Sequence, residues 1–155
     1  MVSRRRMMMT VGTGLLLPVR VSFSQQTPAK IFRIGFLQLG SASLSKSRFD
    51  AFRAGLADRG YVEGKNLVIE SRWADGKMER VPELAAELVR LKVDVLVTSS
   101  GPVIEAAQRA TRSIPIVFAA TGDPVGSGLV QSLARPGGNV TGQTLMTSDL
   151  AGKWL

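Results

Sequence analysis

The chain has 155 residues, of which 45% are hydrophobic and 21% are charged, and these proportions are ordinary for one globular domain with a hydrophobic core. It contains no cysteine and no histidine, which excludes disulfides, thiolate metal sites, thiol nucleophiles and a Ser–His–Asp triad. The formal net charge is +8, but without the first 24 residues 16 basic residues face 12 acidic ones, which leaves +4. The remaining charges are scattered, so we interpret them as a mildly basic solvated surface rather than a nucleic-acid-binding patch.

Residues 1–24 have the pattern of a secretory signal peptide. Three consecutive arginines, Arg4 to Arg6, precede an uncharged run over residues 7–19, and Ser22 and Ser24 lie at small-residue positions before a cleavage site. The apolar run is too short to span a bilayer. The start also resembles a twin-arginine signal, and both export routes stay open. The sequence therefore predicts a soluble periplasmic protein without a lipid anchor, joined to its signal by a linker over residues 25–30.

Apolar runs of strand length alternate with segments of helical periodicity from Ile31 onward. Strands are expected over residues 31–38, 66–73, 93–98, 114–119 and 140–146.

Four helices are expected between these strands. The first is predicted to begin at a capping box formed by Ser47 and Asp50, after a loop over residues 40–45, and to stop at Gly60. Gly101 and Pro102 open the third. The second and fourth helices are expected to turn apolar stripes to the core: Val81, Leu84, Leu88 and Leu91 in the second, and Val125, Leu129, Val130 and Leu133, after Asp123-Pro124, in the fourth.

This alternation predicts an α/β fold with a doubly wound parallel sheet, covered by helices on both faces. Right-handed crossovers favour the strand order 2-1-3-4-5. Sheets of this kind bind ligands at the carboxyl ends of the strands, where the strand order reverses. In this order the reversal lies between the first and third strands.

Small, hydroxyl-bearing and glycine residues follow the first, third and fourth strands at that edge. A helix start with free N–H groups and nearby hydroxyls is suited to a carboxylate. The candidate ligand-binding residues are Gln38, Leu39, Gly40, Ser41, Thr98, Ser99, Ser100, Thr121, Gly122 and Asp123.

Each of these interpretations has a structural alternative. Ser99 or Ser100 could only cap the third helix, and Asp123 is a very good N-cap for the fourth. Gln38 could satisfy loop backbone instead of facing a ligand, and Trp73 could belong to the core or to the cleft.

Catalytic and cofactor motifs are missing from the sequence. Neither phosphate-binding glycine motif occurs in the required context, and the carboxylates show no informative pairing. We therefore expect no enzyme activity, no cofactor and no metal.

Several sequence runs, in conserved order, resemble the ABC-transporter substrate-binding protein family that includes tryptophan- and tyrosine-uptake binding proteins. The runs are Arg33-Ile34-Gly35-Phe36-Leu37, residues 60–67 (GYVEGKNL), residues 70–74 (ESRWA), residues 84–89 (LAAELV), residues 114–118 (IPIVF) and residues 132–142 (SLARPGGNVTG).

The resemblance implies a type I periplasmic-binding fold, in which two lobes close on a small solute such as an amino acid or organic acid, and the closed form docks on a membrane permease. It places binding residues at the ends of the first, third and fourth strands, the three loops named above. It also implies that residues 31–147 form the N-terminal lobe and that residues 148–155 begin the connection to a second lobe. A ligand-sensing effector domain and a doubly wound enzyme domain are the alternatives.

Overall fold

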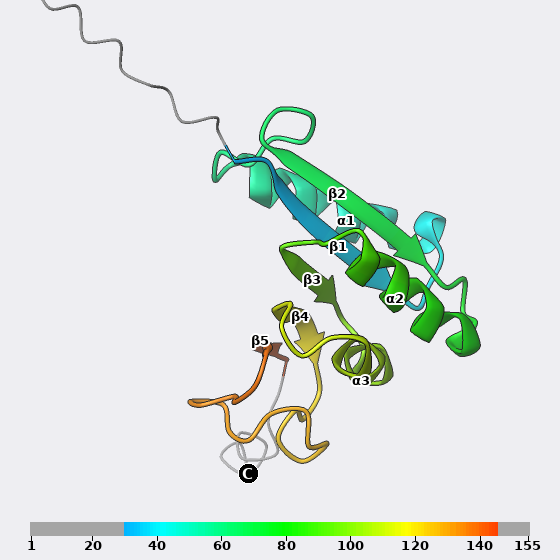
Figure 1. Cartoon of the computed structure of the whole chain (residues 1–155), viewed down its shortest axis with the longest axis vertical. Coiled ribbons are helices and arrows are strands. Elements are labelled where there is room, and N and C mark those ends of the chain that lie inside the picture. The colour runs from blue at the N-terminus through cyan, green and yellow to red at the C-terminus, as the bar shows by residue number, and fades with distance from the viewer. Residues whose placement is uncertain (1–29, 146–155) are drawn as a thin grey trace, which may run out of the picture.

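The computed structural model describes residues 30–145, and within them five strands form one parallel sheet (Figure 1). The strands are β1 (Phe32–Gln38), β2 (Leu67–Trp73), β3 (Val95–Thr98), β4 (Ile116–Thr121) and β5 (Val140–Thr144). Their order is β2-β1-β3-β4-β5, which confirms the predicted order and fold class.

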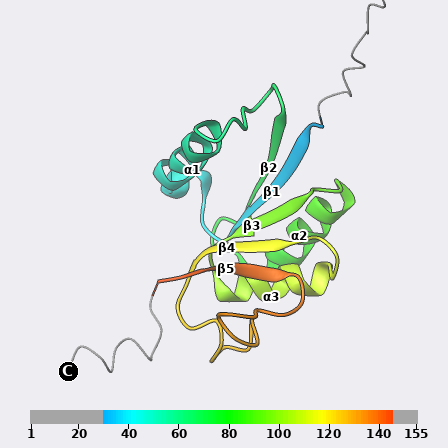
Figure 2. The ribbon, with the colours of Figure 1, turned by 90° about the vertical axis from the view of Figure 1, so that its left-hand side faces the viewer.

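The helices lie on both faces of this sheet (Figure 2). On one face lies α1 (Ala42–Ala57), and on the other lie α2 (Val81–Arg90) and α3 (Gly101–Ala110). A short 3-10 helix, η1 (Met78–Arg80), leads into α2. Because all the crossovers run between parallel strands, the loops that follow β1, β3 and β4 meet at the same edge.

The start of α1 was predicted wrongly. The helix begins at Ala42 and not at Ser47, because Ser41 is in an extended conformation and its side chain accepts a hydrogen bond from the Leu44 N–H. Ser41 thus meets the same capping requirement six residues before the predicted position. Asp50, which was assigned to the capping box, instead pairs with Lys46 one helical turn away, at 2.6 Å.

The fourth predicted helix does not form. Residues 122–139 make turns and bends, and Gly128 has a φ of +74°, which belongs to the left-handed region that interrupts a helix. Leu129 and Val130 are nevertheless buried, as predicted, whereas Val125 and Leu133 are exposed. Two of the four side chains predicted to point inward are therefore buried. The apolar pattern did not predict the backbone conformation that buries them.

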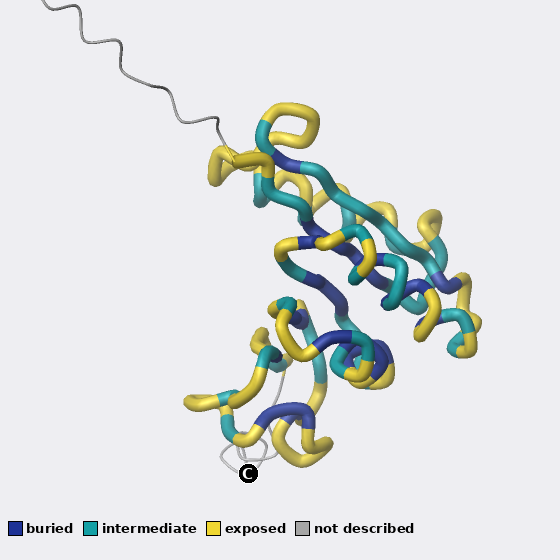
Figure 3. The backbone as a smooth tube through the Cα atoms, viewed as in Figure 1, coloured by how far each residue is buried: buried dark blue, intermediate teal, exposed yellow. Residues whose placement is uncertain are grey.

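The main core lies between the sheet and the pair α2 and α3. Buried residues of this core are found along the strands and in both helices (Figure 3). Gly35 in β1 allows this close approach, since an added Cβ would lie only 2.8 Å from Leu96 Cδ2. A smaller cluster lies under α1, and five of its eleven residues are aromatic. In it the half-buried Trp73 packs against Phe36 and Phe49. Its contacts are therefore those of a core residue, which is one of the two interpretations offered for it above.

Candidate functional site

The first and third strands bring two of the predicted residues into direct contact. Phe36 of β1 is paired in register with Val97 of β3, so the residues two positions further along, Gln38 and Ser99, lie side by side. The Ser99 hydroxyl donates a hydrogen bond of 2.6 Å to Gln38 Oε1. This contact joins the two loops at the position where the strand order reverses.

The loop after β1 is held by the segment that follows β2. The carbonyls of Gln38 and Leu39 accept hydrogen bonds from the N–H groups of Ala74, at 3.0 Å, and Gly76, at 2.7 Å. Ser41 at the end of the loop caps α1 and also lies 3.1 Å from the Ser43 hydroxyl. The Gln38 side chain is thus presented by a fixed backbone, while the Ser41 hydroxyl already has a structural role.

The start of α3 is free of side-chain caps. Ser100 occupies the N-cap position in an extended conformation, but its side chain makes no capping hydrogen bond, and the first turn has no acidic residue. Ser99 is engaged with Gln38 instead. Within residues 30–145, neither serine side chain caps the first N–H groups of α3. These groups belong to Gly101 and Val103, since Pro102 has none, and they keep their capacity to bind an electronegative group.

Thr98 differs from its neighbours because its side chain turns inward. It is only 1% exposed, and its register partner Phe118 belongs to the core beneath α2 and α3. Among the described residues, no hydrogen-bond partner is found for its Oγ1 atom. The hydroxyl of Thr98 is thus buried beneath the candidate site, and its role in ligand binding stays a prediction.

The third loop is tied down by its own contacts. Asp123 Oδ1 accepts hydrogen bonds from the N–H groups of Val125, at 3.1 Å, and Gly126, at 2.8 Å. The Thr144 hydroxyl donates to the carbonyls of Thr121 and Gly122. Asp123 thus caps a turn, in accordance with the capping alternative, although the turn does not continue into a helix.

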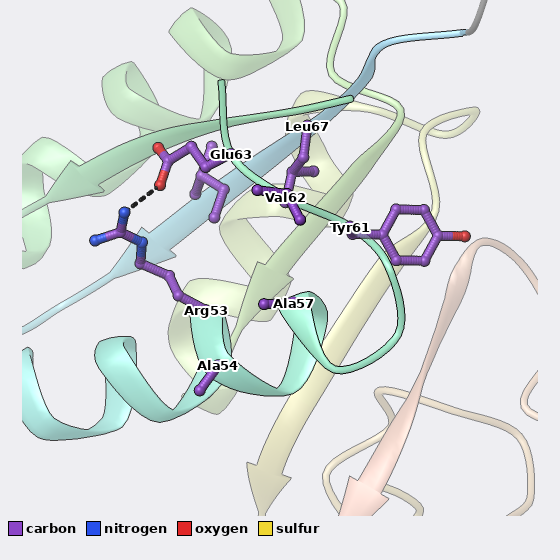
Figure 4. A pocket seen from close by; sticks show the side chains of 8 residues that line it. Arg53, Ala54, Ala57, Tyr61, Val62, Glu63 and Leu67 are labelled. Carbon is purple, nitrogen blue, oxygen red and sulfur yellow. Dashed lines mark ion pairs between the residues drawn. The ribbon is translucent and has the colours of Figure 1, made fainter. Parts of the chain in front are cut away.

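Several surface hollows lie elsewhere on the described part of the chain. One, of about 290 Å³, is formed between the second half of α1 and the segment that enters β2, with Ala54, Ala57 and Leu67 in its wall (Figure 4). Arg53 and Glu63 form an ion pair of 2.7 Å at one end of it, and the Tyr61 ring extends away from them. Leu67 begins β2, so this hollow lies toward the amino ends of the strands, away from the candidate site.

In two of the sequence runs that carry the family resemblance, an asparagine side chain holds a loop of this lobe in place. Asn66 accepts a hydrogen bond from the Val62 N–H and donates one to the Gly60 carbonyl, which closes the loop before β2. Asn139 donates to the carbonyls of Thr111, at 3.2 Å, and Ile114, at 2.8 Å, which ties the start of β5 to the loop before β4. Neither role is apparent from the sequence pattern alone.

Over residues 30–145, no group of three or more acidic residues is placed to hold a metal ion. In the same range, no helix combines the length and the apolar character needed to cross a membrane.

Comparison with known families shows which family this chain belongs to. The family described as ABC transporter substrate binding protein matches residues 37–149. The chain belongs to this family. A tyrosine-binding protein of Clostridioides difficile (strain R20291) is 41% identical over 117 residues, which cover 75% of this chain and 32% of that protein.

Three solved structures share the fold of this lobe. A conserved domain protein from Vibrio cholerae is similar with a TM-score of 0.68 at 37% identity, over 73% of this chain and 38% of that one. An ABC domain in complex with L-Trp from Streptococcus pneumonia gives 0.67 at 32% identity, over 73% and 38%. The ligand-free, open structure of a substrate-binding protein with adhesive properties from Clostridium difficile gives 0.69 at 32% identity, over 77% and 41%. The chain therefore spans well under half the length of these relatives.

Proposed function

We propose that this chain is the ligand-capturing first lobe of an exported ABC-transporter substrate-binding protein, which delivers a small solute to a membrane permease and catalyses no reaction. Membership of the family supports this function over a ligand-sensing effector domain or an enzyme domain. The observation that carries the proposal is the junction of Gln38 and Ser99 beside the uncapped start of α3. Both lie at the edge where parallel α/β sheets bind ligands.

The chemistry of this edge favours a ligand group that accepts hydrogen bonds. The free N–H groups of α3 and the Ser100 hydroxyl are donors, and Gln38 has an amide nitrogen left once its oxygen is bonded to Ser99. A carboxylate of an amino acid or organic acid fits such donors. Relatives described as tyrosine-binding or solved with L-Trp favour an amino acid.

The remaining candidate residues are assigned supporting roles. Ser41 and Asp123 hold the ends of their loops, and the backbone of Leu39, Gly40, Thr121 and Gly122 shapes the floor of the site.

The proposed organisation extends beyond the described residues. A signal peptide over residues 1–24, a linker over 25–30, a lobe over 31–147 and the start of a connection over 148–155 match the proposed export and the greater length of the relatives. Residues 1–29 and 146–155 lie outside the part of the chain that the structure describes.

Substitution of the two serines tests the site. In a two-lobed protein that contains this lobe, we expect Ser100→Ala to weaken binding of L-tyrosine or L-tryptophan roughly ten- to a hundred-fold, since a hydrogen bond to a charged group contributes about 1.5–3 kcal/mol. Ser99→Ala should weaken binding as well, because it removes the hydrogen bond that orients the Gln38 amide. Calorimetric titration measures the affinity. Ser47→Ala, at an exposed position of α1 outside the candidate site, is the matched control and should leave the affinity unchanged. Normal binding by both Ser99 and Ser100 variants would place the site elsewhere.

The isolated chain tests the need for a second lobe. Ligand pockets of this kind bury most of the ligand surface, and one lobe provides only part of that burial. We expect L-tryptophan to bind the 155-residue chain no more tightly than about 1 mM, as measured by amide chemical-shift changes in NMR titration. Shifts confined to Gln38, Ser99 and the first turn of α3 would agree with the proposed site. Micromolar binding by the monomer would show that closure of two lobes is not needed.

A further inference from the structure

A tryptophan lies in register with the candidate site. Trp73, the last residue of β2, is paired with Gln38, the last residue of β1. Ser99 contacts Gln38 from the other side, so the three residues form one row across the neighbouring strands β2, β1 and β3 (Figure 1). Trp73 therefore belongs to the same edge of the sheet as the residues proposed to hold the ligand.

The side chains of Trp73 and Gln38 lie on the α1 side of the sheet. Phe36 belongs to the cluster under α1, and Gln38, two residues further along the same strand, lies on the same face. Trp73 belongs to that cluster as well. The Ala74 N–H donates to the Gln38 carbonyl at 3.0 Å, which fixes the backbone of Trp73 beside Gln38. The indole is thus placed beside the amide by the sheet itself.

Only part of the indole is used by the core. Its ring meets Phe49 at 5.7 Å between centroids and an angle of 84°, and Phe36 at 5.5 Å and 60°, so neither ring is stacked parallel to it. Over residues 30–145 the indole N–H has no hydrogen-bond partner, although Thr98 Oγ1 is the only buried side-chain polar atom without one in that range. The unpaired N–H of the half-buried Trp73 therefore reaches the surface.

The amide of Gln38 connects this indole to the rest of the site. Its oxygen accepts the hydrogen bond from Ser99 on the β3 side, so its NH₂ group is directed away from β3. Two strand spacings, about 10 Å, separate β3 from β2. A ligand whose carboxylate lies at the start of α3 therefore reaches Trp73 only with a long side chain. A flat aromatic side chain gains the most from meeting the indole there, because paired rings attract each other beyond the area they bury.

We propose that Trp73 is a ligand-contacting residue, whose exposed indole packs against the aromatic ring of an amino acid bound at this edge. The inference rests on the proposed capture of an amino acid by the site that Gln38 and Ser99 form. In this arrangement the start of α3 binds the carboxylate, and Trp73, two strands away, binds the ring. Since the sheet and the α1 cluster hold the indole in place before the ligand arrives, little side-chain entropy is lost on binding.

Affinities measured in a two-lobed protein that contains this lobe test the proposal. Trp73→Leu should weaken binding of L-tryptophan about tenfold, whereas Trp73→Phe, which keeps a ring, should weaken it only about two- to threefold. Phe52→Leu is the matched control. The Phe52 ring contacts Phe36 in the same cluster, so this change should lower stability and leave the affinity unchanged. Calorimetric titration gives the affinities, and urea unfolding checks that each variant is folded.

The indole itself gives a second measurement. The indole N–H signal that Trp73→Phe removes from the NMR spectrum should shift when the protein is saturated with L-tyrosine, because the ring of the ligand lies against it. A signal that stays in place would overturn the proposal, as would unchanged affinity in Trp73→Leu or an equal loss in Phe52→Leu.

The two proposals fail in different ways. If Ser100→Ala weakens binding of L-tryptophan and Trp73→Leu does not, the contact with Trp73 is wrong and the proposed function stands. If the wild type binds neither L-tryptophan nor L-tyrosine, the proposed amino-acid ligand is wrong, and the contact with Trp73 is refuted with it.

Discussion

The side of the sheet under α2 and α3 has side chains such as Leu37, Leu88 and Ile104 that are completely shielded from solvent, whereas α1 on the other side has no buried residue at all. Under α1 the side chains are bulkier, and the Phe36 ring contacts both Phe49 and Phe52, yet they are shielded less completely. Size alone thus does not determine how much a residue contributes: a medium-sized side chain enclosed on all sides stabilises more than a large one beneath a single helix. The side under α2 and α3 therefore has a fully enclosed core, whereas the side chains on the other face are covered by the single helix α1.

The largest expected effect separates the two sides directly. Leu88→Ala should lower the free energy of unfolding by about 2–5 kcal/mol, because Leu88 is 0% exposed and its loss leaves a cavity. Phe52→Ala removes a larger side chain but should lower it by only about 1–2 kcal/mol, since Phe52 is half-buried and its surroundings can relax. Urea denaturation measures both, with Leu44→Ala, at an 82% exposed position, as a control with little effect. An equal or greater loss in the Phe52 variant would contradict the comparison.

The same substitution at two glycines should change stability in opposite directions. In Gly35→Ala the added Cβ would lie 2.8 Å from Leu96 Cδ2 and 3.2 Å from Val93 Cγ2, in a core that cannot move freely, so unfolding should become easier by about 1–3 kcal/mol. In Gly55→Ala the only atom near the new Cβ is Arg59 Nη1 at 3.9 Å, and a helix interior favours alanine by about 1 kcal/mol. Thermal unfolding should therefore separate the pair. A gain of stability at position 35 would show that the α2 side is packed less tightly than we infer.

The smallest effect concerns the ion pair between Lys30 and Asp94, just before β3. A hydrogen bond from Lys30, at 2.8 Å, and one from the Arg33 N–H, also at 2.8 Å, hold the pKa of Asp94 below its ordinary value. A carboxyl group with a lowered folded-state pKa stabilises the fold above its unfolded-state pKa, and this contribution is lost as the pH falls through the folded-state value. Asp94→Asn should thus reduce stability slightly at neutral pH and reduce its acid dependence below about pH 4. Because the side chain is 35% exposed, the change should be smaller than either of those above. An unchanged pH profile of urea midpoints would argue against the pair.

The strand order was predictable because β-branched and aliphatic runs alternate with helical periodicity, and handedness leaves few ways to connect them. The region after β4 was not. Its apolar residues, such as Leu129 and Val130, recur at helical spacing, yet Gly126 and Gly128 give the backbone freedom that the pattern does not record. Periodicity reports which side chains are buried more reliably than the conformation that buries them.

The loops of the candidate site were also predictable, because their position follows from the strand order. The roles within them were not. Whether Ser99 caps α3 or bonds to Gln38 depends on the register between β1 and β3, a relation between residues distant in the chain. For Asp123 the capping role was foreseen, since an aspartate before Pro124 needs only its own following N–H groups. Local interactions can be read from neighbouring residues, and long-range ones cannot.

The contact between Gln38 and Ser99 also has a kinetic consequence, because 61 residues separate its two partners in the chain. The pairing of β1 with β3 is equally distant, and the loop entropy lost in closing such a segment precedes any gain from the contact. Parallel sheets of this topology fold slowly compared with helical bundles. Gln38 and Ser99 therefore meet only when β1 and β3 have paired at the centre of the sheet. A refolding experiment that follows ligand-site formation should register it among the last events, after α2 and α3 have already acquired their helical signal.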